Sequence, residues 1–132
     1  MQVVLGMGCD RGTSLKTLES AVINAITSVS LDISHITCLA TIDKKNDETA
    51  LLQLAADHNW LMHFYTANQL ATVTVPNPSP VVLKYMGTPA VSEAAALLAA
   101  KTDLHDLILE KFKFRGDDDK NATVSIARMR DE

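Results

Sequence analysis

A glycine-rich loop near the N-terminus carries the residues best suited to chemistry. The segment reads Gly8-Cys9-Asp10-Arg11-Gly12-Thr13 and follows a short apolar run. Glycine lets backbone amides approach a ligand closely, and a helix that begins after the loop would point its positive dipole end at the same place. We therefore expect the loop to bind an anionic group through Gly8, Gly12 and Thr13. The Arg11 guanidinium can add a bidentate grip on a carboxylate or phosphate.

The spacing of the glycines leaves two interpretations open. Gly6, Gly8 and Gly12 form the pattern G-x-G-x-x-x-G. This pattern is neither the dinucleotide-binding fingerprint nor a P-loop. The same glycines would equally make a tight turn from a strand into a helix, so a ligand loop and a structural turn remain alternatives.

Three residues are candidates for a catalytic role. Cys9 lies just before the expected start of a helix, where the pKa of a thiol tends to fall, and such a thiol is a nucleophile. A small cysteine that fills a turn is the favoured alternative, because no histidine lies nearby in the sequence to activate it. Thr13 offers a hydroxyl, and Asp43 could act as a general base or bind a ligand hydroxyl. Asp43 could equally cap its own loop.

A second loop offers positive charge. It reads Thr41-Ile42-Asp43-Lys44-Lys45 and follows the next apolar, β-branched run. Consecutive strands of a parallel sheet tend to be neighbours, so this loop is expected beside the first. The candidate binding residues here are Thr41, Asp43, Lys44 and Lys45. Lysines that simply face solvent are the alternative.

The elements that must position these loops alternate along the first half of the chain. Strands are expected at residues 2–7, 36–42 and 61–65, and helices at 13–29 and 48–59. The helices show apolar residues every three or four positions, and the strands are rich in valine and isoleucine. Such β-α-β-α-β alternation predicts a parallel sheet with right-handed crossovers. Ligands of such sheets bind beyond the carboxyl ends of the strands, where both loops lie.

The second half of the chain changes character. Three prolines at positions 76, 78 and 80 predict an ordered loop over residues 73–79, followed by a short helix near 81–86. Gly87-Thr88-Pro89 then opens an alanine-rich helix that runs to Ala100. Residues 107–114 and 122–129 alternate in polarity and predict a hairpin, with the acidic residues 117–119 at a solvated tip. Lys111, Lys113 and Arg115 would share one strand face, expected toward solvent.

The predicted fold class is therefore α/β. We expect a single domain over residues 1–132, with a mainly parallel βαβαβ sheet flanked by helices and a C-terminal β-hairpin. The acidic composition, 12 Lys+Arg against 16 Asp+Glu, argues against a nucleic-acid binder. No apolar run is long enough for a membrane span, and the N-terminus lacks signal-peptide features. Two cysteines and four scattered histidines predict no disulfide framework and no metal site, so a reduced cytoplasmic protein is expected.

Several motifs, taken in order, resemble the cobalamin biosynthesis family that includes CobE and the C-terminal domain of CbiG. The matching stretches are residues 8–13, residues 39–45, Pro76-Asn77-Pro78-Ser79, Gly87-Thr88-Pro89-Ala90-Val91-Ser92-Glu93-Ala94-Ala95-Ala96 and residues 122–128. One departure is Asp10, where a basic or small polar residue would fit the family pattern. This departure weakens a doubly basic anion grip in the first loop.

The resemblance implies a role in making the corrin ring. CbiG-type proteins open the δ-lactone of cobalt-precorrin-5A and release acetaldehyde, and this chain is similar to their C-terminal domain or to stand-alone CobE. The implied ligand is an anionic precorrin, with cobalt present only as part of a bound corrinoid and with no separate cofactor. The resemblance adds a second wall to the expected site, formed by Asn77, Ser79, Gly87 and Thr88.

Three functions remain open at this point. The chain could bind a precorrin and take part in lactone hydrolysis, although no nucleophile–base pair in the sequence favours catalysis by the chain alone. It could be a non-enzymatic carrier or partner module for other corrin-pathway enzymes. A nucleotide-binding domain is the residual alternative.

Overall fold

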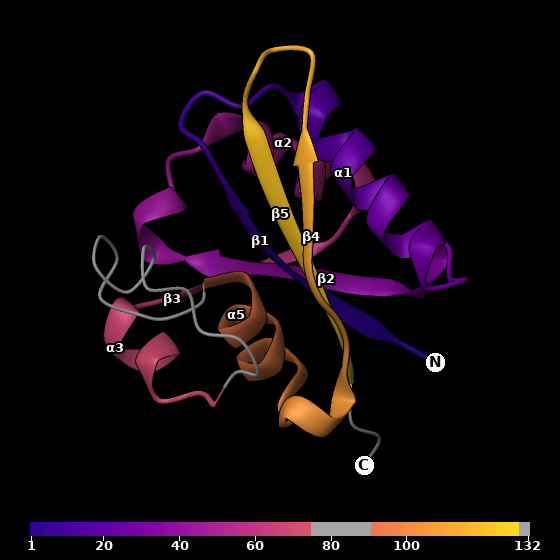
Figure 1. The fold of residues 1–132 in the computed structure, drawn as a ribbon. Helices are drawn as coiled ribbons and strands as arrows, with labels where there is room; N and C mark the ends of the chain where they lie inside the picture. The colour runs from indigo at the N-terminus through magenta and orange to yellow at the C-terminus, as the bar shows by residue number, and fades with distance from the viewer. Residues whose placement is uncertain (75–90, 130–132) are drawn as a thin grey trace.

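The computed structural model describes residues 1–74 and 91–129 and contains a five-stranded sheet. The strands are β1 (Val3–Cys9), β2 (Ile36–Ile42), β3 (Leu61–Tyr65), β4 (Leu107–Arg115) and β5 (Asn121–Arg128). The α-helices are α1 (Leu15–Ser28), α2 (Thr49–His58), α3 (Ala67–Ala71) and α5 (Val91–Ala100). Short 3-10 turns η1 (Ile33–His35), η2 (Asp43–Lys45) and η3 (Leu104–Asp106) precede β2, follow β2 and precede β4. Figure 1 shows the sheet between two layers of helices.

The strand order is β3-β2-β1-β5-β4. The first three strands are parallel, and the β4–β5 hairpin joins the free edge of β1 through an antiparallel β1–β5 pair. The predicted α/β class, the parallel βαβαβ unit and the C-terminal hairpin are confirmed. The sequence could not order the strands, and the hairpin proves to supply two of the five strands of the same sheet.

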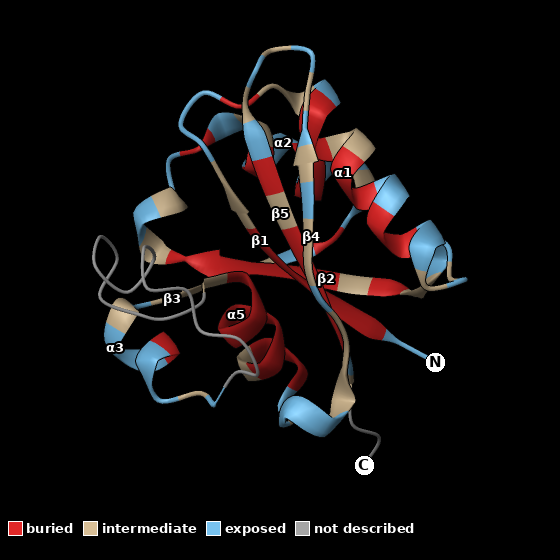
Figure 2. Ribbon diagram, viewed as in Figure 1, coloured by how far each residue is buried: buried red, intermediate tan, exposed pale blue. Residues whose placement is uncertain are grey.

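Two apolar cores lie on opposite faces of the sheet. One packs α1 and α2 against Leu5, Met7, Leu39 and Ile126, and the other packs α5 and α3 against residues such as Ala40. Helix α1 buries one stripe, whereas α5 is buried almost all round (Figure 2). The apolar positions of each helix therefore follow its packing. Helix α1, covered on one side, has one apolar stripe, whereas α5, covered on most sides, is apolar or small nearly throughout.

Helix α5 lies unusually close to the sheet because small residues meet there. A Cβ built on Gly6 of β1 would lie 1.8 Å from the Ser92 carbonyl oxygen and 2.8 Å from the Ala96 nitrogen. Only a glycine allows the helix backbone to rest on the strand at this point. The alanines of α5 are needed for the same close approach.

The structure differs from the predicted elements in two details, and some predictions lie outside the described residues. Helix α3 was not predicted, although Thr66 and Gln69 form a capping box that is readable in the sequence as Thr-x-x-Gln. The first strand runs on to Cys9, two residues beyond its predicted end. The predicted helix near 81–86, nearly all of the proline loop and the Gly87-Thr88-Pro89 helix start lie outside the described residues. In the part of the chain that is described, no helix is long and apolar enough to cross a membrane.

Candidate functional site

The carboxyl ends of β1 and β2 meet the turn of the β4–β5 hairpin at one edge of the sheet. Gly8 of β1 is paired with Thr123 of β5, and Thr123 is paired with Lys113 of β4. These three residues therefore lie in one row across three strands. Because side chains alternate along a strand, Gly8 faces the α5 side, as Gly6 does.

A cavity of about 460 Å³ opens on the α5 side of this edge, and we refer to it as the α5-side cavity. Five predicted site residues line it, namely Gly8, Cys9, Arg11, Thr41 and Lys45. The lining that was not predicted consists of Asp10, Ile42, Val91, Ser92, Glu93, Lys111, Lys113, Asn121 and Thr123. The cavity thus lies at the strand ends that the sequence predicted, and the part of its wall that β4, β5 and α5 contribute was not predicted.

Four predicted residues do not line this cavity, namely Gly12, Thr13, Asp43 and Lys44. Gly12 adopts a left-handed φ of 76°, and its amide donates to Glu48 at 2.8 Å. The Thr13 hydroxyl donates to the Asp10 carbonyl at 2.6 Å. Asn77, Ser79, Gly87 and Thr88 lie outside the described residues, so their predicted role stays a prediction.

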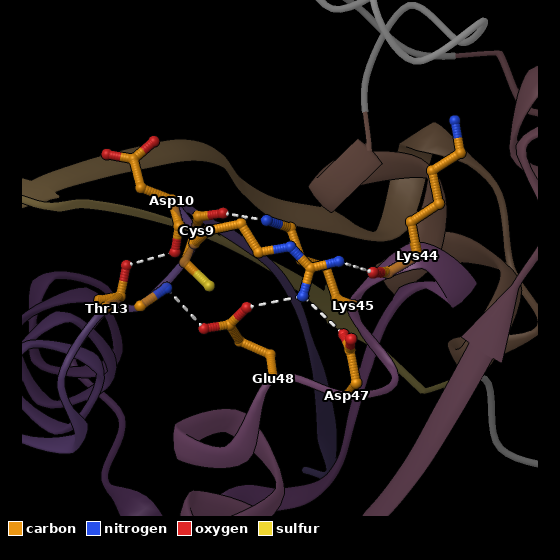
Figure 3. A network of polar contacts seen from close by, with 9 residues as sticks. Cys9, Asp10, Thr13, Lys44, Lys45, Asp47 and Glu48 are labelled. Carbon is orange, nitrogen blue, oxygen red and sulfur yellow. Dashed lines mark hydrogen bonds and ion pairs between the residues drawn. The ribbon is translucent and has the colours of Figure 1, made fainter.

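Arg11 is held by the chain's own acidic groups (Figure 3). Its guanidinium donates to Asp47 and, at 3.0 Å, to buried Glu48, and its other amino group donates to the Lys44 carbonyl. Glu48 thus bridges Arg11 and the Gly12 amide with its two oxygens. We call Arg11, Gly12, Lys44, Asp47 and Glu48 the Arg11 network. The Arg11 guanidinium and the Gly12 amide are therefore already paired with carboxylates of the same chain. The sequence alone does not show these pairs.

The N-terminus of α1 is also occupied by a carboxylate from within the chain. Asp118 accepts hydrogen bonds from the Ser14 amide and the Thr17 hydroxyl, both at 2.9 Å. These bonds, led by the one from the Ser14 amide, lower the pKa of Asp118 to about 2. The prediction that the whole acidic triplet is a solvated tip is therefore wrong for Asp118, while Asp117 and Asp119 are largely exposed. The hairpin folds back onto α1 because Gly116 leaves room for Thr17.

Cys9 does not have the environment of a nucleophile. Burial raises the pKa of its thiol, and this effect outweighs the opposing charge of Lys45. Lys45 donates its ammonium proton to the Cys9 carbonyl rather than approaching the sulfur as a free cation. The favoured interpretation, a small cysteine that fills a turn, agrees with this geometry. Cys38 is buried in β2, as predicted, and burial raises its pKa to about 11.

The part of the cavity wall that α5 and β4 form contains a buried carboxyl group. The side chain of Glu93, in the first turn of α5, is 1% exposed, and Lys111 Nζ of β4 lies 3.6 Å from its Oε2. Burial raises the pKa of Glu93, opposed by the Lys111 charge. The predicted solvent-facing position of Lys111 is therefore corrected: its side chain is 23% exposed and lines the cavity. Lys113 shares that face and is exposed, because β4 lies at the sheet edge, where no further strand covers it.

No group of three metal-ligating side chains is found among residues 1–74 and 91–129. His58 instead contacts Glu19 at 2.7 Å and stacks on Trp60, and His63 stacks on Tyr65. The donors at the cavity are ammonium, hydroxyl and amide groups. This set suits an anionic organic ligand more than a bare cation.

Comparisons with known proteins agree with the fold. Residues 3–127 match the family described as "Cobalamin synthesis G C-terminus". The cobalt-precorrin-5A hydrolase of Priestia megaterium is 32% identical over 125 residues, which is 95% of this chain but 32% of that protein. Protein CobE of Sinorhizobium sp is 30% identical over 100 residues, 74% of this chain and 65% of that protein. The chain thus spans less than two thirds of either relative.

Solved structures give the same result. The crystal structure of CobE, a protein from the cobalamin (vitamin B12) biosynthetic pathway, superposes with a TM-score of 0.83 at 32% identity, covering 99% of this chain and 92% of that one. The cobalamin biosynthesis protein chiG from Agrobacterium tumefaciens gives a TM-score of 0.66 at 26% identity, covering 98% and 99%. With a family match over nearly its whole length, this chain belongs to the cobalamin biosynthesis family formed by CobE and the C-terminal domain of CbiG.

Proposed function

We propose that this domain binds an anionic, precorrin-type tetrapyrrole at the α5-side cavity as a step of cobalamin biosynthesis. The observation that carries the proposal is the pair of lysines, Lys111 and Lys113, on the cavity-facing side of β4. The chain as a whole has a net charge of −4, so attraction of a polyanion depends on local cations. Precorrins carry acetate and propionate side chains that would supply the matching carboxylates.

The state of each cation supports this choice of residues. The Arg11 side chain is paired with Asp47 and Glu48. The side chain of Lys113, in contrast, has no hydrogen bond or ion pair with any residue in the described ranges. An exposed ammonium loses little hydration when it meets a ligand carboxylate at the surface. Ser92, Asn121 and Thr123 add hydroxyl and amide groups that can donate to the same ligand.

The shape of the cavity also fits part of a macrocycle. About 460 Å³ lies in the range of small-molecule sites. Gly8 forms part of the lining, and no described atom lies within 4 Å of a Cβ built on it. The site would hold one edge of the tetrapyrrole with its carboxylate side chains, and the flat ring would pass close to the Gly8 backbone.

Calorimetric titration with cobyrinic acid, a stable corrin with carboxylate side chains, tests the proposal. Wild type is expected to bind it, and Gly8→Val is expected to lose at least tenfold in affinity because the added side chain fills the cavity. Lys113→Met should lose about threefold, the value of one exposed ion pair. Lys16→Met is the matched control, since Lys16 is 79% exposed on α1 and does not line the cavity. Absence of binding to wild type, or equal affinities of wild type and Gly8→Val, would contradict the proposal.

A second candidate function is participation in lactone opening. It is favoured by the 32% identity to about a third of the length of a cobalt-precorrin-5A hydrolase. The raised pKa of Cys9 gives no support to a thiol mechanism. Acetaldehyde release from cobalt-precorrin-5A by this chain is the direct assay. Binding without release would favour the carrier or partner role in the same pathway.

A further inference from the structure

Glu93 is the least satisfied polar group among the residues that the structure describes. Its Oε2 is fully buried and accepts no hydrogen bond from a described residue. Its Oε1 receives a long hydrogen bond of 3.4 Å from the Ser92 hydroxyl, which lies 2.8 Å from the Ser125 hydroxyl. A buried carboxylate that lacks partners costs free energy, and such groups are concentrated at functional sites.

The partner that compensates Glu93 is Lys111. The 3.6 Å between Lys111 Nζ and Glu93 Oε2 is an ion-pair distance but too long for a good hydrogen bond. Lys111 belongs to β4 and is one of the residues that line the cavity. The same lysine therefore pairs with Glu93 and lines the cavity.

A carboxylate that enters the cavity must compete with Glu93 for the same ammonium. Two carboxylates around one lysine in a buried place repel each other, and the cheapest relief is protonation of one of them. Glu93 is the better candidate for this proton, because its burial already favours the neutral acid. A ligand carboxylate keeps its water contacts at the mouth.

We propose that Lys111 receives a carboxylate of the bound molecule and that Glu93 is the resident counter-anion of Lys111, which gives up the ammonium and takes a proton when that carboxylate binds. The ligand class is a carboxylate-bearing organic anion, and the inference rests on the proposed function of the cavity. No covalent bond changes: one proton moves from solvent to Glu93, and one ion pair is exchanged for another.

Other titratable groups lie at the cavity and on the elements that pack against α5. At the cavity, Arg11 belongs to the Arg11 network and Lys45 is bonded to the Cys9 carbonyl. Asp10 accepts from the Asn121 amide, and Lys113 lies two residues further along β4 toward the hairpin turn. Helix α3 carries no titratable side chain, and β2 and β3 contribute Cys38, His63 and Tyr65.

Calorimetry with cobyrinic acid at pH 6, 7 and 8, each in two buffers of different ionisation enthalpy, tests the exchange. Wild type should take up between about half a proton and one proton per ligand, and its affinity should accordingly rise about ten- to a hundredfold from pH 8 to pH 6. Glu93→Gln imitates the protonated acid. It should bind at pH 8 as tightly as wild type does at pH 6, with no pH slope and no proton uptake from this residue.

Two lysine variants complete the design. Lys111→Met should lose at least tenfold in affinity and also lose the pH slope, whereas Lys113→Met should lose about threefold and keep the slope. Cobinamide, in which amides replace these side-chain carboxylates, should bind weakly and without proton uptake. A melting curve for each variant establishes that it is folded, and Lys111→Met keeps the test available if Glu93→Gln is not.

The outcomes separate the two proposals. If wild type binds no corrinoid, the proposed function fails, and the inference fails with it. If wild type binds but Glu93→Gln binds more weakly, Glu93 contacts the ligand directly and the exchange is overturned. An unchanged pH slope in Glu93→Gln would also overturn it, because the proton would then go to another group.

Discussion

Two charged regions lie side by side at the same edge of the sheet, and they differ in how their charges are matched. In the Arg11 network, and in the adjoining α1 N-terminus, the Arg11 guanidinium and the amides of Gly12 and Ser14 each meet a carboxylate from the chain: Asp47, Glu48 or Asp118. In the α5-side cavity, Lys113 is unpaired within the described ranges, and Glu93 has an oxygen without a hydrogen bond. The first region links parts of the chain to one another, whereas the second is the region that we propose for a ligand.

This contrast shows that an anion-binding motif in a sequence does not tell whether a ligand or a carboxylate of the same chain occupies it. A glycine loop before a helix attracts negative charge, and a carboxylate of the same chain can supply it. Asp118 arrives from about a hundred residues away, carried by the hairpin. Our proposal therefore places the ligand beside Lys113, whose ammonium has no partner in the described part of the chain.

The two glycines of β1 give the largest contrast. Gly6→Ala should lower the free energy of unfolding by about 3 kcal/mol, because the new Cβ would overlap the Ser92 carbonyl and push α5 off the sheet. Gly8→Ala meets no described atom and should leave stability within about 0.5 kcal/mol of wild type. Chemical denaturation of both variants measures this. Equal losses would mean that Gly8 is also a packing residue and would weaken its assignment to the cavity.

Removal of Glu48 tests whether the Arg11 network is structural. Glu48→Ala leaves the Gly12 amide and Arg11 without their buried acceptor, and should cost about 2 kcal/mol of stability. Affinity for cobyrinic acid should change less than twofold, unless freed Arg11 turns to the ligand. A variant of normal stability but with greatly weakened binding would show that this region, and not the α5 side, contacts the ligand.

The carboxylate at the N-terminus of α1 should show itself in the pH dependence of stability. The pKa of Asp118 falls from its ordinary 3.8 to about 2 in the folded chain, so its contribution is complete above pH 5 and is lost as pH falls from about 4 to 2. Asp118→Ala should therefore lower the melting temperature by about 5 °C at pH 7 and by much less at pH 2. The exposed neighbour Asp119→Ala is the control and should change the melting temperature little at either pH. An equal loss of melting temperature for Asp118→Ala at both pH values would contradict a role of the ionised Asp118 carboxylate at the α1 N-terminus.

The smallest effect concerns Cys9. Its raised pKa predicts slow alkylation by iodoacetamide at pH 7, slower than free cysteine, with a rate that rises steeply above pH 9. A saturating ligand in the cavity should slow the reaction further, because Cys9 lines it. Mass spectrometry after timed quenching measures the rates. Fast alkylation at neutral pH would contradict this prediction and would support the alternative that Cys9 is a thiolate nucleophile.

Part of the site could be predicted because local pattern decides it. The alternation of strands and helices placed Gly8, Thr41 and Lys45 at carboxyl ends of parallel strands, and all three line the cavity. Lys111 and Lys113 were correctly assigned to one strand face, but the direction of that face depends on β4 being the edge strand beside β5 and above α5. No local pattern contains that information.

The fold class, the helices that flank the sheet and the strand ends at which the cavity opens all follow from local patterns, since hydrophobic period and turn residues act over short distances. Which charged groups pair with one another depends on how the elements pack. Glu48 reaches Arg11 across 37 residues, Asp118 reaches Ser14 across 104, and Lys111 meets Glu93 from another element. Coulombic and hydrogen-bond partners are set by distance in space, and sequence separation says little about that distance.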